Sequence, residues 1–249
     1  MRLISLLRLL VIVLLAMPVL MVLAAWLQWN DGSADILLGM ASTVLPSYVV
    51  SSLGLCFWVA IGVISMGSVS AAAVTLFDFK GRRSMEWALL LPLAMPAYVV
   101  AYAYSDFLQF SGPLQTSLRQ LTGLQGRVFP EVRNVWGAAW VMTFSLYPYV
   151  YLLVRAALVE RAPQLMEAAR LLGADLPRRI FRVALPLARP AIAAGTALAL
   201  METLADFGVS SYFGVTTFST GIYKAWLVMD DRVAAAQLAT FLLLLVAVM

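Results

Sequence analysis

Apolar residues form long runs in this chain, and short polar or charged segments separate them. A helix needs about 20 apolar residues to cross the hydrocarbon core of a bilayer. Runs close to this length cover residues 3–29, 47–77, 85–104, 135–154 and 191–207, and a further run covers residues 233–249. This pattern predicts an all-α, polytopic membrane protein with about six transmembrane helices in a single transmembrane domain, residues 1–249.

The first run admits two interpretations. Arg2 and Arg8 precede most of its apolar residues, as basic residues precede the apolar core of a secretory signal. The apolar stretch from residue 9 to residue 27 is longer than the core of such signals, and further spans follow it. We therefore expect an uncleaved membrane anchor.

The third run contains two prolines, Pro92 and Pro96, four residues apart. Proline removes a backbone N–H and its ring clashes with the preceding turn, so this spacing predicts a kink inside the span. Between the runs we expect a short polar connection at residues 30–46, an outer loop at 105–134 with a short helix around 114–121, and a polar stretch between the fifth and sixth spans.

A charged island at residues 155–190 interrupts the apolar pattern after the fourth run. The spacing of its leucines and alanines predicts a first helix over residues 163–172. Gly173 follows the last periodic residue and suits a left-handed C-cap, and Pro177 favours the start of a second short helix. The island therefore predicts a helix, a turn and a helix outside the bilayer.

Basic residues gather on one side of the predicted topology. If the N-terminus is cytoplasmic, the cytoplasmic segments hold twelve of the 17 lysines and arginines. Positive residues are enriched in the cytoplasmic loops of membrane proteins, so this asymmetry predicts that the N-terminus and the charged island lie in the cytoplasm. The twelve residues are Arg2, Arg8, Lys80, Arg82, Arg83, Arg155, Arg161, Arg170, Arg178, Arg179, Arg182 and Arg189.

Composition supports a membrane protein and argues against several kinds of chemistry. Apolar residues make up 63% of the chain, charged residues only 12%, and the mean hydropathy is +0.90. The chain has no histidine, which is the usual general base, and its lone Cys56 has no partner for a disulfide. We expect no catalytic residue, metal site or cofactor in this chain. Membrane topology explains the net charge of +4, so we expect no nucleic-acid partner.

Within the island, Glu167-Ala168-Ala169 is followed by Gly173 and then by Val183-Ala184-Leu185-Pro186. This pattern resembles the cytoplasmic loop of permease subunits in ATP-driven, binding-protein-dependent importers, the ABC importers. Val183 stands where that family usually has isoleucine. The resemblance implies a type I importer permease fold in the bacterial inner membrane, with the island forming coupling helices.

The resemblance also implies partners. A cytoplasmic ABC ATPase dimer binds ATP and Mg²⁺ and receives the coupling helices in a groove, and a periplasmic substrate-binding protein delivers the solute. The chain itself is then a transport subunit and not an enzyme. Small alanines allow a close approach of the partner, and the glutamate offers an acceptor. The basic face of the coupling loop consists of Arg170, Arg178, Arg179 and Arg182.

Further segments resemble the ferric-iron branch of this family, and the resemblance covers essentially the whole chain. These segments are residues 92–98, 147–151, 202–208, 212–215 and 220–223. The resemblance implies ferric iron as the transported solute. Phosphonate, polyamine, thiamine and sulfate stay open as alternatives, because specificity in this family lies largely in the binding protein.

Two carboxylates lie near the outer end of the fifth span. Glu202 and Asp206 are four residues apart, so a continuing helix places them on one face. A carboxylate at membrane depth is costly unless it faces a polar cavity or a partner. One hypothesis is that they line the translocation path, and the other is that they lie in interfacial water or pair with Arg133 or Arg232. The rival function, an ion-coupled secondary transporter, uses the same two carboxylates.

Two groups of tyrosines lie at the ends of predicted spans. Tyr98, Tyr102 and Tyr104 offer oxygen ligands for a ferric ion, but they lie at the outer end of the third span, where aromatic belts form. We favour the belt. The same interpretation applies at the inner end of the fourth span to Tyr147, Tyr149 and Tyr151.

The last run, residues 233–249, offers only seventeen residues for a span. We expect this span to be cut short and the chain to be one half of a longer permease, because the ferric permeases that it resembles carry two such halves in one polypeptide. A two-fold ATPase dimer presents two grooves. A second permease half, in the same longer chain or as a homodimer mate, is therefore an expected partner.

Overall fold

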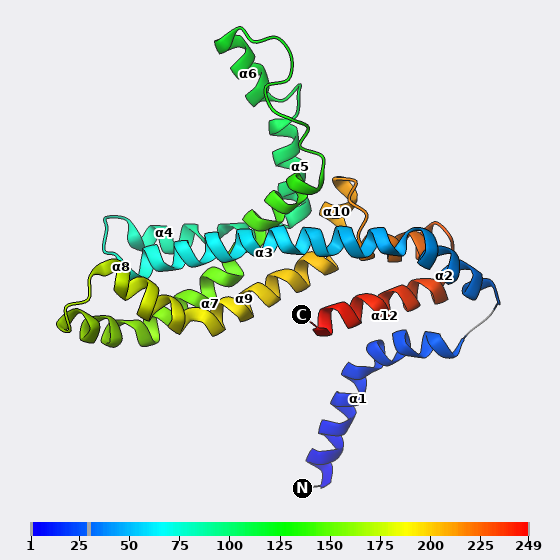
Figure 1. The fold of residues 1–249 in the computed structure, drawn as a ribbon. Helices are drawn as coiled ribbons and strands as arrows, with labels where there is room; N and C mark the ends of the chain where they lie inside the picture. The colour runs from blue at the N-terminus through cyan, green and yellow to red at the C-terminus, as the bar shows by residue number, and fades with distance from the viewer. Residues whose placement is uncertain (1, 29–30, 249) are drawn as a thin grey trace. The chain divides into compact units, whose positions relative to one another are not determined.

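The computed structural model describes residues 2–28 and 31–248 (Figure 1). Every regular element within these residues is helical, as the apolar pattern predicts. The helices form two compact units, one built from Met1–Ser52 and Thr216–Met249 and the other from Leu53–Val215. The second unit contains the charged island, the outer loop and the two carboxylates of the fifth span.

The long helices follow the predicted spans. They are α1 (Arg2–Ala24), which continues into η1 (Ala25–Leu27), α3 (Leu45–Leu76), α7 (Val135–Leu171), α9 (Leu185–Ala205) and α12 (Arg232–Val248). Among the described residues, four helical stretches are long and apolar enough to cross a membrane, or up to five if a bent pair counts as one span. α12 is apolar but shorter. Trp29 and Met249, which end the predicted first and sixth spans, lie outside the described residues.

The predicted third span, residues 85–104, is not one helix. α4 (Arg82–Ala88) and η2 (Leu91–Ala94) form its first part, and α5 (Ala97–Leu108) begins its second part. The two parts are bent by 96° relative to one another. Met95 at the break is extended, with φ −113° and ψ 128°, because the following proline excludes the helical region. The prolines therefore produce a sharp corner where the sequence predicted a kink.

The predicted fourth span is the first part of a much longer helix. α7 passes the end of that span and continues through the predicted first helix of the island. The Asn134 side chain caps its start and accepts the Gly137 N–H at 2.9 Å. Good helix formers dominate the start of the island, and Pro163 does not interrupt α7. The prediction of a separate helix over residues 163–172 is therefore wrong.

Two segments predicted to be polar connections are largely helical. The structure contains α2 (Asp31–Thr43) in the first, and α10 (Gly208–Tyr212) and α11 (Phe218–Leu227) in the second. α11 begins with a capping box in which Thr217 and Thr220 each accept the other's backbone N–H. These polar residues, whose pattern predicted a loop, thus accept the free backbone N–H groups at the start of a helix. The helix predicted in the outer loop is confirmed as α6 (Pro113–Thr122).

In the second unit, α7 and α9 lie side by side (Figure 1). Val150 of α7 is fully buried where two glycines approach it. A Cβ atom added at Gly195 of α9 meets the Val150 Cα at 2.7 Å, and one added at Gly67 of α3 meets the Val150 Cβ at 2.7 Å. Glycine therefore lets three helices meet at one point, as small residues do in membrane helix contacts.

In the first unit, the start of α3 packs on α11. The Tyr48 ring lies against Gly221 and has its centroid 6.4 Å from that of Phe218. The Ser52 hydroxyl accepts the Phe218 N–H at 3.1 Å. Aromatic contacts and one long-range hydrogen bond therefore hold these two helices together.

Candidate functional site

The C-terminal end of α7 forms the tip of the charged island. Gly173 has a φ of +79°, which confirms the predicted left-handed C-cap. The Gly173 N–H donates to the Arg170 carbonyl at 3.0 Å, and the Ala174 N–H donates to the Ala169 carbonyl at 3.0 Å. Together these bonds form a Schellman motif, which uses carbonyls left free at a helix end. The four-residue separation of Ala169 and Gly173 is the separation that this cap requires.

The tip presents small and apolar side chains on its surface. Glu167 and Ala168 are exposed, and Leu171 and Leu172 are 84% and 88% exposed. Met166 is buried on the same turn and joins the hydrophobic core of the second unit. Adjacent exposed leucines beside a charged residue are typical of an interaction surface.

The second half of the island leads directly into α9. α8 (Leu176–Arg179), the π-turn η3 (Ile180–Ala184) and α9 follow one another without a break. Pro186 lacks an N–H for the carbonyl four residues earlier, and the π-turn lies where that bond is missing. The predicted start of a second helix at Pro177 is confirmed as α8, but the prediction that this helix is short is wrong, because these residues form the first turns of one long helical stretch.

The remaining residues of the predicted coupling site lie along this stretch. Val183 and Pro186 are half-buried and Leu185 is exposed. Arg178 forms an exposed ion pair with Asp175 at 3.8 Å, and such pairs contribute little to stability. Of the other basic residues, Arg170 and Arg182 are exposed and Arg179 is half-buried.

An ion-pair network ties α7 to α4 behind the island. Arg155 Nη2 lies 2.7 Å from Glu86 Oε2, and Arg82 Nε lies 3.2 Å from Glu86 Oε1. Arg82 also reaches Asp78 Oδ1 at 2.6 Å, and the Tyr151 hydroxyl donates to the Glu86 carbonyl at 3.2 Å. Glu86 was not among the residues predicted from the sequence to be functional. The available signal was that it is the only acidic residue in its predicted span.

Tyr147 and Tyr151 are not aromatic-belt residues. Their side chains are 4% and 0% exposed and belong to the hydrophobic core. The Tyr147 hydroxyl donates to the Leu89 carbonyl at 2.9 Å, so both hydroxyls bond to the backbone of the broken third span. A buried tyrosine needs such a partner. The belt interpretation is therefore wrong for these two residues.

The carboxylates of the fifth span do not share a helix face, because α9 ends at Ala205. Asp206 Oδ1 accepts the N–H groups of Val209 at 2.8 Å and Ser210 at 3.3 Å. Asp206 thus satisfies backbone donors at the start of α10, in the manner of a capping residue. Glu202 is exposed on the last turn of α9.

Arg133, one of the arginines expected to pair with these carboxylates, has other contacts. Its Nη2 donates to the Tyr212 carbonyl at 2.9 Å, and its guanidinium carbon lies 4.7 Å from the centre of the Tyr212 ring. Within the part of the chain that the structure describes, no cluster of three or more acidic or cysteine side chains is placed to hold a metal ion.

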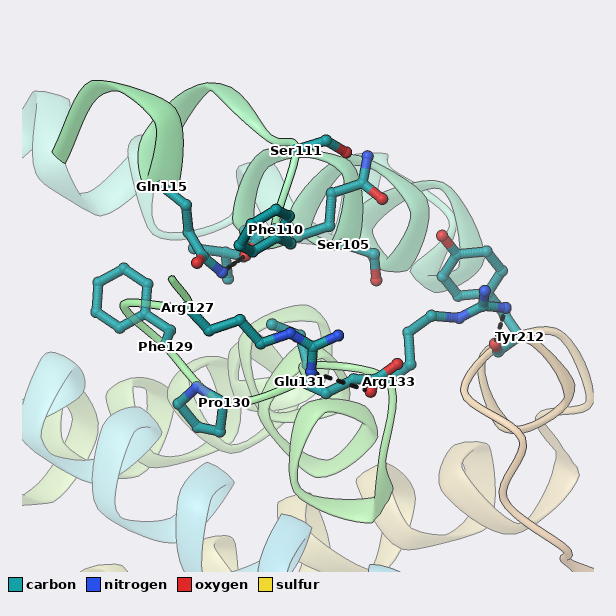
Figure 2. Close-up of a pocket in the computed structure, with 13 residues that line it drawn as sticks. Ser105, Phe110, Ser111, Gln115, Arg127, Phe129, Pro130, Glu131, Arg133 and Tyr212 are labelled. Atoms are coloured by element: carbon teal, nitrogen blue, oxygen red, sulfur yellow. Dashed lines mark hydrogen bonds and ion pairs between the residues drawn. The ribbon is translucent and has the colours of Figure 1, made fainter. Parts of the chain in front are cut away.

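The outer loop encloses a cavity of about 250 Å³ (Figure 2). α5, α6, the segment before α7 and Tyr212 line it. Gln115 of α6 is 2% exposed and joins two walls, because it donates to the Leu108 carbonyl at 2.8 Å and accepts the Val128 N–H at 3.2 Å. The sequence predicted a loop with a short helix in this region but no cavity.

Residues 64–249 match the family described as "Binding-protein-dependent transport system inner membrane component". The Fe(3+)-transport system permease protein FbpB 2 of Haemophilus influenzae is 28% identical over 185 residues, which cover 74% of this chain and 32% of that protein. The sulfate transport system permease protein CysT of Salmonella typhimurium is 28% identical over 191 residues, which cover 74% of this chain and 62% of that protein. The chain thus spans less than two thirds of both relatives.

A third relative, the putative 2-aminoethylphosphonate transport system permease protein PhnU of Salmonella typhimurium, is 25% identical over 197 residues, 77% of this chain and 68% of that protein. Among solved structures, a chain of a bacterial alginate ABC transporter, in complex with its alginate pentasaccharide-bound periplasmic protein, superimposes with a TM-score of 0.78 at 20% identity. This match covers 98% of the present chain and 89% of the other, and it shows a shared fold. Because the family match extends over well more than half of its residues, the chain belongs to the binding-protein-dependent transport system inner membrane components.

Proposed function

We propose that this chain is the transmembrane permease subunit of an ATP-driven ABC importer in the bacterial inner membrane, with its N-terminus in the cytoplasm. A separate ATPase dimer hydrolyses ATP, and a periplasmic binding protein delivers the solute. Family membership and the helical fold support this assignment. The capped tip of α7, with exposed Glu167 beside two exposed leucines, is the observation that supports coupling to an ATPase.

The tip has the properties that a docking element needs. The cap at Gly173 fixes the end of α7, so little conformational entropy is lost when a partner binds. Ala168 is small and lets a partner approach the helix backbone, while Glu167 offers a charged acceptor. Met166 and the Arg155–Glu86 pair join the tip to the helices behind it. In the proposal, closure of the ATPase dimer moves the tip and with it the packed helices.

Two substitutions at the tip test the coupling role. We expect Glu167→Lys and Gly173→Val to leave the chain inserted but to abolish solute-stimulated ATPase activity and transport in reconstituted vesicles. Charge reversal introduces repulsion at the docked surface. Valine resists the positive φ at Gly173, a conformation that costs L-residues about 1–2 kcal/mol. Normal transport by both variants would show that the docking assignment is wrong.

Two control variants distinguish a loss of ATPase docking from a loss of folding. Gly123 also has a positive φ, +69°, at the C-cap of α6 in the outer loop. Gly123→Val therefore introduces similar strain away from the tip, and it should keep the co-purified ATPase that Gly173→Val loses. Glu167→Gln keeps an acceptor without repulsion and should retain more activity than Glu167→Lys.

For the solute, we propose ferric iron, on the strength of the segments that resemble ferric permeases and of the FbpB 2 match. The equal identity to the sulfate permease and the match to the phosphonate permease support sulfate and phosphonate as alternatives. The binding protein that co-purifies with the chain decides among them. We expect ferric iron in the ligand site of that binding protein. An oxyanion in the same site would instead assign sulfate or phosphonate as the transported solute.

We also propose that Glu202 and Asp206 line the translocation path. Glu202→Gln and Asp206→Asn should lower transport while ATPase docking is kept. Asparagine retains a side-chain oxygen for the Val209 and Ser210 N–H groups, so the start of α10 should survive the second change. Unchanged uptake by the double variant would assign both carboxylates to the interface with water.

A further inference from the structure

The outer-loop cavity contains a buried hydroxyl without a partner. Ser105 of α5 is 4% exposed, and its Oγ has no hydrogen-bond partner within the described residues. Figure 2 shows the Ser105 side chain pointing from α5 toward the space between Arg127 and Arg133. Buried polar groups are nearly always hydrogen-bonded, and those that are not call for an explanation. A ligand atom in the cavity would supply the missing partner.

Two arginines border the same space. Arg127 Nη1 lies 3.3 Å from Glu131 Oε2, and Arg133 Nη2 donates to the Tyr212 carbonyl. A guanidinium carries five N–H donors, so each arginine keeps further donors for a ligand. With two arginines and one glutamate, the lining carries a net positive charge. The cavity therefore favours an anion.

The walls of the cavity are held in place before any ligand binds. The Arg133 guanidinium stacks on the Tyr212 ring, and the Arg119 guanidinium lies 4.3 Å from the centre of the Phe110 ring and donates to the Phe110 carbonyl at 2.8 Å. Gln115 fixes the wall between them through its two backbone contacts. A preformed site loses little entropy on binding.

A neighbouring groove shows that this lining is distinctive. That groove, of about 380 Å³, shares the segment before α7 but is bordered by aromatic residues of α7, including Trp136 and Trp140. Arg127 and Arg133 do not line it. The two sides of one loop thus differ in chemistry, and of the two linings only the arginine side carries positively charged donors for an anion.

We propose that the outer-loop cavity is a binding site for one small oxyanion, a carboxylate, sulfate or phosphonate group, held by Arg127, Arg133 and the Ser105 hydroxyl. Planar guanidinium groups bind such oxygens in a bidentate manner. The group belongs either to a free solute or to an acidic side chain of another protein. This inference concerns a site apart from the coupling tip and does not depend on an ATPase.

Calorimetric titration of the full chain in detergent tests the site. The probes are sulfate, methylphosphonate and acetyl-aspartyl-amide, each titrated at constant ionic strength against a chloride reference. We expect saturable binding of about one anion per chain. Arg127→Gln and Arg133→Gln should each weaken binding at least about tenfold, and Ser105→Ala about threefold, as lost charged and neutral hydrogen bonds do.

One variant should act in the opposite direction. Glu131→Gln removes a negative charge from the lining, so it should strengthen anion binding several-fold, an effect that misfolding does not produce. Arg83→Gln removes an exposed arginine of α4, away from the cavity lining, and should leave binding unchanged. Tighter binding of acetyl-aspartyl-amide would assign the site to a protein side chain, and tighter binding of the inorganic probes to a free solute. Absence of saturable binding by all three probes, or full binding by both arginine variants, would overturn the proposal.

Discussion

Glu86 places one carboxylate between two arginines, at 2.7 Å from Arg155 and 3.2 Å from Arg82, and its side chain is only 19% exposed. Removing one partner of such a pair leaves the other charge poorly solvated. We expect Glu86→Gln and Arg155→Gln each to lower the free energy of unfolding by about 1–3 kcal/mol, with a coupling energy of about 1 kcal/mol between them. Denaturation of the two single variants and the double variant in detergent measures these values.

A second, more exposed ion pair provides the control for the Glu86 network. Arg178 and Asp175 are 3.8 Å apart, and their side chains are 59% and 68% exposed. Arg178→Gln should change the free energy of unfolding by less than about 0.5 kcal/mol. If Arg178→Gln and Arg155→Gln destabilise the chain equally, the network behind the island has no special role.

Single residues were predictable where only their near neighbours decide the conformation. Gly173 is such a residue, because its positive φ and its cap bonds involve residues within five positions in the sequence. Tyr147 and Tyr151 were not predictable in this way. Their hydroxyls bond to carbonyls 58 and 65 positions earlier, which become available only where the third span is broken.

Among the elements, the packing of α7 on α9 depends on the absence of a side chain at Gly195. A Cβ there meets the backbone of Tyr149 and Val150, which cannot rotate away as a side chain would. We expect Gly195→Ala to separate the two helices locally and to destabilise the chain by about 1–3 kcal/mol. Thermal unfolding in detergent measures the loss.

Gly54 in α3 is the matched control, because a Cβ atom added there meets nothing within 4 Å. Alanine has a higher helix propensity than glycine by about 1 kcal/mol, so Gly54→Ala should be neutral or slightly stabilising. Equal destabilisation by both substitutions would show that the close approach at Val150 does not hold the helices together.

Helix boundaries were the least predictable feature at the scale of elements. Apolar runs located the spans, but α7 does not end where the charged island begins, because the residues of the island continue to favour helix. Threonines that suggested a loop instead cap α11. The two prolines indicated the place of the corner at Met95 but not its angle.

For the whole molecule, we expect two permease domains for each ATPase dimer, because a two-fold dimer presents two equivalent grooves. Native mass spectrometry of the complex purified from membranes measures this ratio. Two copies of the permease domain, in one longer polypeptide or in two chains, with two ATPase subunits agree with the proposal. A complex that contains one permease domain for two ATPase subunits would contradict it.

The family and the helical fold were predictable at this scale from the coupling motif and the apolar runs, and the match over residues 64–249 confirms the family. The solute was not predictable. The relatives include permeases for ferric iron, sulfate and 2-aminoethylphosphonate at similar identity, and the described residues offer no metal-ligand cluster that would distinguish them. The outer-loop cavity was also missed, because residues distant in the sequence form its walls.

The source of energy for uptake tests the central claim most directly. The measurement compares solute uptake into vesicles that contain the chain, its ATPase partner and the binding protein, either with enclosed ATP or with an imposed proton or sodium gradient. The account predicts uptake that requires ATP, continues when ionophores collapse the gradients, and is lost with Glu167→Lys. Uptake driven by a gradient without ATP or ATPase, and abolished by Glu202→Gln, would contradict it and identify a secondary transporter.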